Sequence, residues 1–319
     1  RVNQQTDSHF DESYQDILKT LLSISIPIII GTAIFSITNL IDAKMVMSIL
    51  QSLGMSEMEA NELYGQLTGK YVTLTNLPVS ISSALAAAVV PSIAASMALK
   101  ERKVVMNKVN LALRVSMILA APSMVGLFVL GDPILKMLFP NYPGGGDLLR
   151  IGSIAIIFLS VVQVSTAILQ GVGKVMVPAR NAAIGTACKI IINYLLISVP
   201  LLNIKGAVIS TVICYIIISF LDMKAVRKVT KVKIDILGTY VKPIAASVVM
   251  GIFSRIFYKL FLWGSQSNTF ATMGSIILSI VVYCSFLIVI GGITKEDIFL
   301  LPKGELIYSK LTKMGMMQE

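Results

Sequence analysis

The sequence has few charged side chains and very few of the residues on which enzymes and metal proteins most often depend. Only 14% of its 319 residues are charged, against about 25% in soluble domains, so a soluble protein of this composition could not cover its surface with polar groups. His9 is the only histidine, which excludes a His-based triad and a His-rich metal site. Cys188, Cys214 and Cys284 lie in apolar stretches and form no ligand motif, so we interpret them as small buried apolar residues.

Motifs for nucleotide chemistry are also missing. The stretch from Gly65 to Tyr71 resembles a P-loop only superficially, because its spacing is wrong and Tyr71 stands where a Ser or Thr is needed. The sequence therefore predicts a chain that is not an enzyme, with no cofactor, no metal and no catalytic residue. Any transport by such a chain would use an ion gradient or the membrane potential, because the sequence has no ATP-binding motif.

What the sequence does contain is long apolar blocks. Its residues are 55% hydrophobic, the mean hydropathy is +0.81, and about 20 apolar residues suffice to cross the hydrocarbon core of a bilayer. We predict an all-α integral membrane protein with eight transmembrane helices. They span approximately 19–50, 71–98, 109–131, 148–170, 177–199, 204–223, 239–261 and 270–292.

The basic residues indicate how these spans are oriented. Of 27 Lys and Arg, 18 fall in one alternating set of loops, 5 in the other and 4 within spans. Cytoplasmic loops carry the excess of Lys and Arg, so we expect both termini to be cytoplasmic. The net charge of +10 does not indicate nucleic acid, because the basic residues lie in short loops between apolar blocks.

The same pattern predicts four parts of the chain. These are a cytoplasmic amphipathic segment (1–18), a six-helix lobe (19–226), two additional transmembrane helices (227–292) and a cytoplasmic tail (293–319). Caps of the Ser-x-x-Asp/Glu type at Ser8 and Ser56 start either interfacial helices or the first solvated turn of the next span. Turn-forming residues between Gly131 and Asp147 predict the longest loop.

Polar residues inside predicted spans are the candidate site residues, because charge in a bilayer is costly. Lys189 lies mid-span, with Asn193 and Asn181 on roughly the same helical face. This pattern indicates either a polar cavity or a bond to another helix. Asp42, which follows Asn39, either forms a structural ion pair or takes part in transport. Arg114 lies near a span end, where its side chain either reaches the interface or enters a cavity.

Several of these residues carry a resemblance to a known family. The stretch from Pro27 through Asn39-Leu40-Ile41-Asp42, then Leu53-Gly54-Met55-Ser56 and Tyr64-Gly65, resembles the seventh helix and following loop of the MurJ/SpoVB-type flippases. Asn76-Leu77-Pro78 and Val90-Pro91-Ser92-Ile93 are similar to the eighth helix of that family. Further similar positions in the ninth to eleventh helices are Pro122, Gly126, Leu138-Phe139-Pro140, Leu169-Gln170-Gly171, Gly173-Lys174, Pro178, Asn181, Gly185, Lys189 and Asn193.

The resemblance covers residues 15–225 well and the remainder by hydropathy. It implies a member of the multidrug/oligosaccharidyl-lipid/polysaccharide exporter superfamily, in which two six-helix lobes enclose a central cavity. The eight spans would be helices seven to fourteen, and the N-terminal lobe of the same protein would be a missing partner. The implied cargo is an undecaprenyl-pyrophosphate-linked oligosaccharide, such as lipid II, which moves from the inner to the outer leaflet of a bacterial cell membrane. Membrane lipids are the other implied partners.

The candidate substrate-binding cavity then comprises Lys70, Lys189, Asn193, Asp42, Asn39 and Arg114. Where the family carries a cavity arginine before the eighth-helix proline, this sequence has Thr73, and Lys70 lies about one turn away. Lys70 would supply the charge for a pyrophosphate as a point cation.

Two other functions compete with this interpretation. A cation-coupled multidrug antiporter of the same superfamily would need acidic cavity groups. Within the predicted spans only Asp42 clearly qualifies, whereas Lys44, Arg114 and Lys189 are basic, so the charge balance disfavours an antiporter. A membrane enzyme acting on the same lipid would need exposed carboxylates or a catalytic loop. The predicted outer loops offer Glu57, Glu59, Glu62, Asp132 and Asp147.

Overall fold

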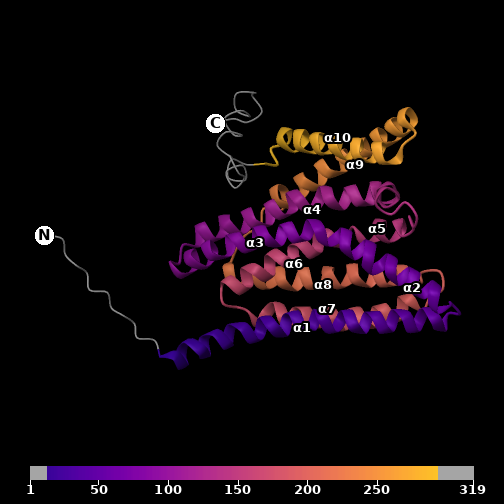
Figure 1. Ribbon diagram of the computed structural model, residues 1–319. Coiled ribbons are helices and arrows are strands. Elements are labelled where there is room, and N and C mark those ends of the chain that lie inside the picture. Colours follow the sequence, from indigo (N-terminus) through magenta and orange to yellow (C-terminus); the bar gives the residue numbers. More distant parts are fainter. Residues whose placement is uncertain (1–12, 294–319) are drawn as a thin grey trace.

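The computed structural model describes residues 13–293, and within this range the chain consists of helices without strands (Figure 1). Helices are expected in a bilayer, because lipid offers no partner for backbone N–H and C=O groups. The elements are α1 (Tyr14–Ser52), α2 (Glu57–Gly65), the π-helical turn η1 (Gln66–Val72), α3 (Thr73–Ala98), α4 (Arg102–Leu138), α5 (Gly146–Gly152), α6 (Ala155–Gly171), α7 (Met176–Ile197), α8 (Ile204–Thr230), the π-helical turn η2 (Leu237–Val241), α9 (Lys242–Ser265) and α10 (Asn268–Val289).

Six helical stretches are long and apolar enough to cross a membrane by themselves, and together they confirm the predicted membrane fold. They are Tyr14–Ser52, Glu57–Ala98, Arg102–Leu138, Ile204–Thr230, Leu237–Ser265 and Asn268–Val289. A seventh span results if α5 and α6, which are bent by 48°, cross together. α7 has 22 residues, carries several polar side chains and is not among them, so the count of eight spans stays a prediction.

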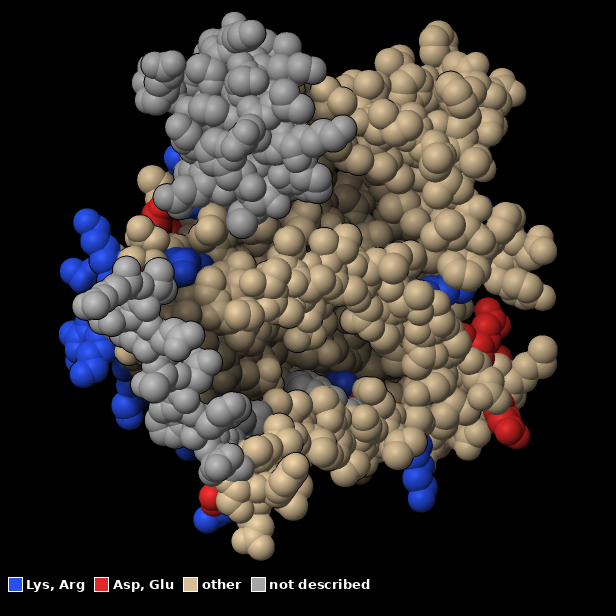
Figure 2. Space-filling view, turned by 60° about the vertical axis from the view of Figure 1, so that its left-hand side comes forward, with Lys and Arg blue, Asp and Glu red and all other residues tan. Residues whose placement is uncertain are grey.

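The long helices lie roughly alongside one another in layers (Figure 1). α1 packs on α7 at one edge, and α9 and α10 pack on each other and on α4 at the opposite edge. The order agrees with a lobe followed by two added helices, although the boundary at 226 stays a prediction. α1 begins and α10 ends at the same end of the molecule. Lys and Arg gather mainly along one side in Figure 2.

The start of α2 follows the predicted cap. The Ser56 side chain accepts from the Glu59 N–H at 3.3 Å, and the Glu59 carboxylate accepts from the Ser56 N–H at 2.8 Å. From there α2, η1 and α3 form one membrane-length helix, so α2 is an extension of the next span. The other predicted cap, at Ser8, lies outside the described residues, and Ser13 caps α1 instead.

The predicted loop between Gly131 and Asp147 is partly wrong. α4 continues through Pro133 to Leu138, and the connection to α5 comprises residues 139–145. Side chains of other elements hold this end of α4: Arg150 donates to Asp132 at 2.9 Å, and Asn268 donates to the Pro133 carbonyl at 3.1 Å. A proline disturbs the backbone bonds of the preceding turn, and these neighbours stabilise the helix where the sequence favours a turn.

The three largest buried apolar clusters among the described residues join most of the bundle. One joins α1, α2, η1, α4, α5, α7 and α8 through residues such as Leu50, Tyr71 and Ile197. A second joins α3, α4, α6 and α8 through residues such as Ile93 and Ile168, and a third joins α4, α9 and α10. Polar side chains of α1, α7 and α8 contact one another inside the bundle, where they form the candidate site.

Candidate functional site

An ion pair between α1 and α7 is the centre of the site. The Lys189 ammonium binds the Asp42 carboxylate, and the two side chains are 11% and 15% exposed. Each charge is expensive to bury alone, and a partner with further hydrogen bonds offsets that cost. The pairing therefore explains how the apolar helices α1 and α7 can each carry a charged side chain that is nearly buried.

Hydrogen bonds extend this pair to α8. Asn193, one helical turn beyond Lys189, donates to the other Asp42 oxygen at 3.1 Å, and Ser210 donates to the Asn193 side-chain oxygen at 3.0 Å. Asn193 and Ser210 are fully buried. The network links three helices through side chains that are mutually satisfied, which is the arrangement that makes a buried polar cluster stable.

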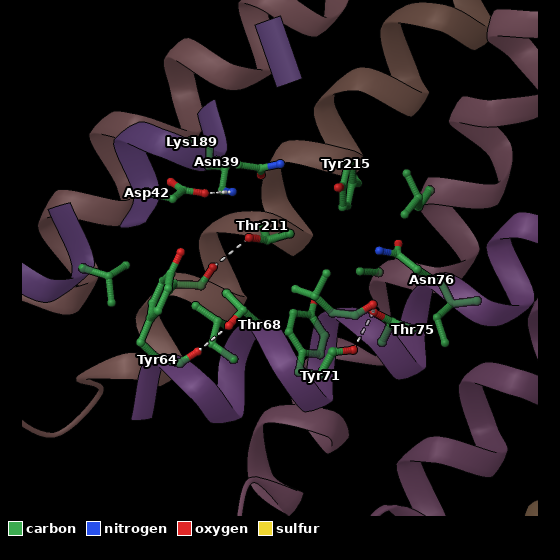
Figure 3. A pocket seen from close by; sticks show the side chains of 17 residues that line it. Asn39, Asp42, Tyr64, Thr68, Tyr71, Thr75, Asn76, Lys189, Thr211 and Tyr215 are labelled. Atoms are coloured by element: carbon green, nitrogen blue, oxygen red, sulfur yellow. Dashed lines mark hydrogen bonds and ion pairs between the residues drawn. The ribbon is translucent and has the colours of Figure 1, made fainter. Parts of the chain in front are cut away.

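A cavity of about 310 Å³ opens beside the ion pair. In Figure 3, Asn39, Asp42 and Lys189 lie on one side of it, and Tyr64, Thr68 and Tyr71 lie on the other. The polar lining residues come from α1, α2, η1, α3, α7 and α8. They are Asn39, Asp42, Tyr64, Thr68, Tyr71, Thr75, Asn76, Lys189, Thr211 and Tyr215.

A second cavity, of about 480 Å³, adjoins the first and shares Asn39, Asn76, Leu159 and Tyr215 with it. Its further polar lining residues are Thr32, Ser83, Gln163, Thr166 and Gln170. None of the described residues lining this second cavity is charged. The two cavities together form a mostly uncharged polar path along α1, α3, α6 and α7, with the ion pair at one end.

A buried carboxylate behind the second cavity was missed by sequence reasoning. Asp222 of α8 is fully buried, accepts from Asn181 at 2.8 Å, and also accepts from Thr166, which lines the cavity, at 3.5 Å. Asp222 lies at the end of the predicted span 204–223, next to the basic residues that follow that span. α8 continues to Thr230, so Asp222 lies inside the helix.

The structure brings together four of the six predicted site residues: Asp42, Lys189, Asn193 and Asn39. Asn181, predicted on the same face as Lys189, instead binds Asp222. Arg114 lies on α4 and is not among the residues that line either cavity.

Lys70 is also not among the residues that line the two cavities, and its contact with a substrate stays a prediction. Its ammonium donates to the carbonyls of Tyr142, at 2.5 Å, and Gly144, at 2.9 Å, and lies 5.3 Å from the centre of the Phe139 ring. The carbonyl groups of the nearby 139–145 connection therefore satisfy the ammonium. Lys70 thus anchors that connection to η1.

The groups around the ion pair are suited to binding a polar or anionic ligand. A lysine ammonium held by a carboxylate is a cation that an incoming anion can share, and hydroxyl and amide groups nearby can hydrogen-bond sugars or phosphate oxygens. Among the described residues, no group of three or more His, Cys, Asp or Glu side chains could hold a metal ion.

Comparison with known proteins agrees with this geometry. The family model of the lipid II flippase MurJ matches residues 6–281. Two relatives from Bacillus subtilis (strain 168) are similar: the uncharacterized membrane protein YabM, 26% identical over 99% of this chain and 59% of that protein, and stage V sporulation protein B, 27% identical over 92% and 57%. The chain therefore spans somewhat more than half the length of these relatives.

Solved structures show the same fold. The lipid II flippase MurJ in an inward closed conformation matches with a TM-score of 0.65 and 18% identity, over 86% of this chain and 55% of that one. An outward-facing multidrug resistance MATE family transporter of the MOP superfamily matches with a TM-score of 0.52 and 17% identity, over 93% and 69%. With a family match over most of its length, a membrane-helix bundle and a polar cavity between the helices, this chain belongs to the MurJ lipid II flippase family.

Proposed function

We propose that the chain forms the second lobe of a transporter that moves an undecaprenyl-pyrophosphate-linked oligosaccharide from the inner to the outer leaflet by alternating access. Lipid II or a related cell-wall precursor is the cargo. The observation that carries this proposal is a polar cavity, with Lys189 at its wall, in a chain of this family. We place both termini in the cytoplasm of a bacterial cell, as the Lys and Arg bias predicts.

Lys189 is the group that meets the anionic headgroup. Among the described residues lining the two cavities it is the one basic side chain, and Asp42 neutralises it while the cavity is empty of cargo. A pyrophosphate that enters through the second, larger cavity competes with Asp42 for the ammonium. Asn193 would hold the Asp42 carboxylate as the ammonium turns to the phosphate. During this exchange the ammonium always faces an anion, and Asp42 keeps the hydrogen bond from Asn193.

The cavity described here is one wall of the transport path. The chain spans 59% and 57% of the two relatives, and a preceding six-helix lobe supplies the opposite wall. An inside-negative membrane potential favours outward movement of an anion by roughly 2.3 kcal/mol per charge per 100 mV. No ATP is needed on this account.

The test uses bacteria depleted of their own flippase, in which the chain is expressed together with an N-terminal lobe of the family. We expect precursor to reach the outer leaflet, as measured by labelling with a membrane-impermeant probe. Lys189→Ala should reduce this export roughly tenfold or more, because it removes the cation and leaves Asp42 unpaired. Lys205→Ala, which breaks an exposed pair with Asp147, is the matched control. Unchanged export by Lys189→Ala at equal expression would contradict the role of Lys189.

A multidrug antiporter of the same superfamily is the alternative, and Asp222 is the observation in its favour. It adds a second intramembrane carboxylate beside the cavity path. However, Asp222 does not line either cavity, and Asp42 is already paired with Lys189. Export of cationic drugs that is lost in Asp42→Asn, without any export of precursor, would favour the antiporter.

A further inference from the structure

A groove on the outside of the bundle, separate from the polar cavities, carries two basic residues inside an apolar surface. It lies between α4 and α9 and has a volume of about 660 Å³. Its apolar walls come from residues such as Val125, Phe128, Val248 and Ile252, and its basic residues are Arg255 and Lys259 of α9. The groove shares none of its described lining residues with the polar cavities.

The basic pair is unusual in both position and surroundings. Arg255 and Lys259 are one helical turn apart on the same side of α9, so their charges repel. Both residues are exposed, and neither makes an ion pair or a hydrogen bond with a described residue. Asp132 of α4 is bound by Arg150 instead. Nothing among the described residues neutralises this pair.

The pair lies in the second half of α9. At a rise of about 1.5 Å per residue, Lys259 and Arg255 lie roughly 9 and 15 Å from Ser265, the last residue of α9. Long basic side chains extend from such depths toward the interface while their stems stay in the apolar layer. This is the end of α9 that turns into α10, away from the end where α1 begins and α10 ends (Figure 1).

We propose that this groove binds one anionic phospholipid, with an acyl chain between α4 and α9 and the phosphate on Arg255 and Lys259. A lipid matches the groove better than free phosphate, because the walls are apolar and phosphate would leave them uncovered. A bound anion also removes the repulsion between two adjacent cations. The site is independent of the proposed transport function, and in the predicted orientation it takes its lipid from the outer leaflet.

Native mass spectrometry of the full chain, released from detergent with added lipid, tests the site. We expect phosphatidylglycerol to remain bound and phosphatidylcholine with the same acyl chains to be lost. The double variant Arg255→Ala/Lys259→Ala should weaken phosphatidylglycerol binding on the order of tenfold, since each basic residue contributes to anionic-lipid attraction. The conservative variant Arg255→Lys should retain most of the binding, and it keeps the test valid if the double variant does not fold.

A matched control removes two basic residues elsewhere on the chain. Lys136→Ala/Lys205→Ala lowers the net charge equally, and neither residue lines the groove. We expect this control to bind phosphatidylglycerol like the unchanged chain. Equal binding of both lipids, equal binding by the Arg255/Lys259 double variant, or equal loss in the control would each overturn the proposal. Binding of inorganic phosphate that matches that of the lipid would show an anion site without a lipid site, and would overturn it as well.

Discussion

At the scale of single residues, the Asp42–Lys189 pair stabilises two charges inside this bundle, because each charge neutralises the other. The Asp42 carboxylate accepts hydrogen bonds from the Lys189 ammonium and from the Asn193 side-chain amide. The side-chain oxygen of Asn193 in turn accepts a hydrogen bond from the Ser210 hydroxyl. Removal of one member leaves the other charged and nearly buried. The pair is thus a bond between helices as well as the candidate contact for the cargo.

A double-mutant cycle should show this coupling. Asp42→Asn and Lys189→Met should each lower the free energy of unfolding by about 3–5 kcal/mol, because each leaves one buried charge without its partner. The double variant should lose clearly less than the sum of the two losses. The measurement is denaturant unfolding in detergent micelles followed by circular dichroism. Strictly additive losses would contradict a direct interaction between the two side chains.

Sequence reasoning found this site in part. It identified Asp42, Lys189 and Asn193, because charged and amide residues are conspicuous in apolar spans. It left open whether Asp42 pairs with a basic residue, since pairing depends on how α1 lies against α7. Lys70 is predicted in the cavity because it lies about one turn from Thr73, where the family carries a cavity arginine. The sequence does not show that carbonyls of the 139–145 connection bind its ammonium. Asp222 lies at the end of the predicted span 204–223, and the sequence alone does not show that its side chain is buried.

At the scale of elements, hydropathy predicted the existence and order of the long helices but not their lengths. α4 is 37 residues long and extends well beyond the predicted span 109–131. Hydropathy locates the apolar centre of a helix, whereas capping and contacts with other elements determine its ends. Hydropathy also did not predict that the span 148–170 consists of two helices. α5 and α6 are bent by 48° relative to each other, and the break lies near Gly152 and Ser153.

Close helix contacts at glycine offer a test of the packing of α7 and α8. A methyl group at Gly206 would lie 2.6 to 2.8 Å from backbone atoms of Leu196 and Ile197, which cannot move aside as a flexible side chain can. Gly206→Ala should therefore lower the free energy of unfolding by about 1–3 kcal/mol. Thermal unfolding in detergent would measure the change.

Gly126 of α4 is the matched control for this substitution. A methyl group there would meet nothing within 4 Å, so Gly126→Ala should stabilise the helix by roughly 0.5–1 kcal/mol through backbone entropy alone. If both substitutions had the same effect, the close approach of α8 to the end of α7 would be contradicted.

At the scale of the whole molecule, the distribution of Lys and Arg predicts the orientation in the membrane. Cysteine labelling in intact cells, in a background without the native cysteines, tests it. Tyr142→Cys, in the 139–145 connection, should react with a membrane-impermeant thiol reagent, because Tyr142 is 74% exposed and should face outward. Lys103→Cys, in the basic first turn of α4, should react only after the cells are permeabilised. The reverse pattern would contradict the predicted orientation.

The central claim is that this chain is one lobe of a flippase for a lipid-linked oligosaccharide. It is tested most directly by reconstituting the chain with an N-terminal lobe of the family in vesicles that carry a fluorescent polyprenyl-pyrophosphate-linked sugar in one leaflet. The account predicts that the probe reaches the other leaflet faster than in empty vesicles, and that Lys189→Ala abolishes most of this increase. Transfer no faster than in empty vesicles, from an assembly shown to be folded and complete, would contradict it.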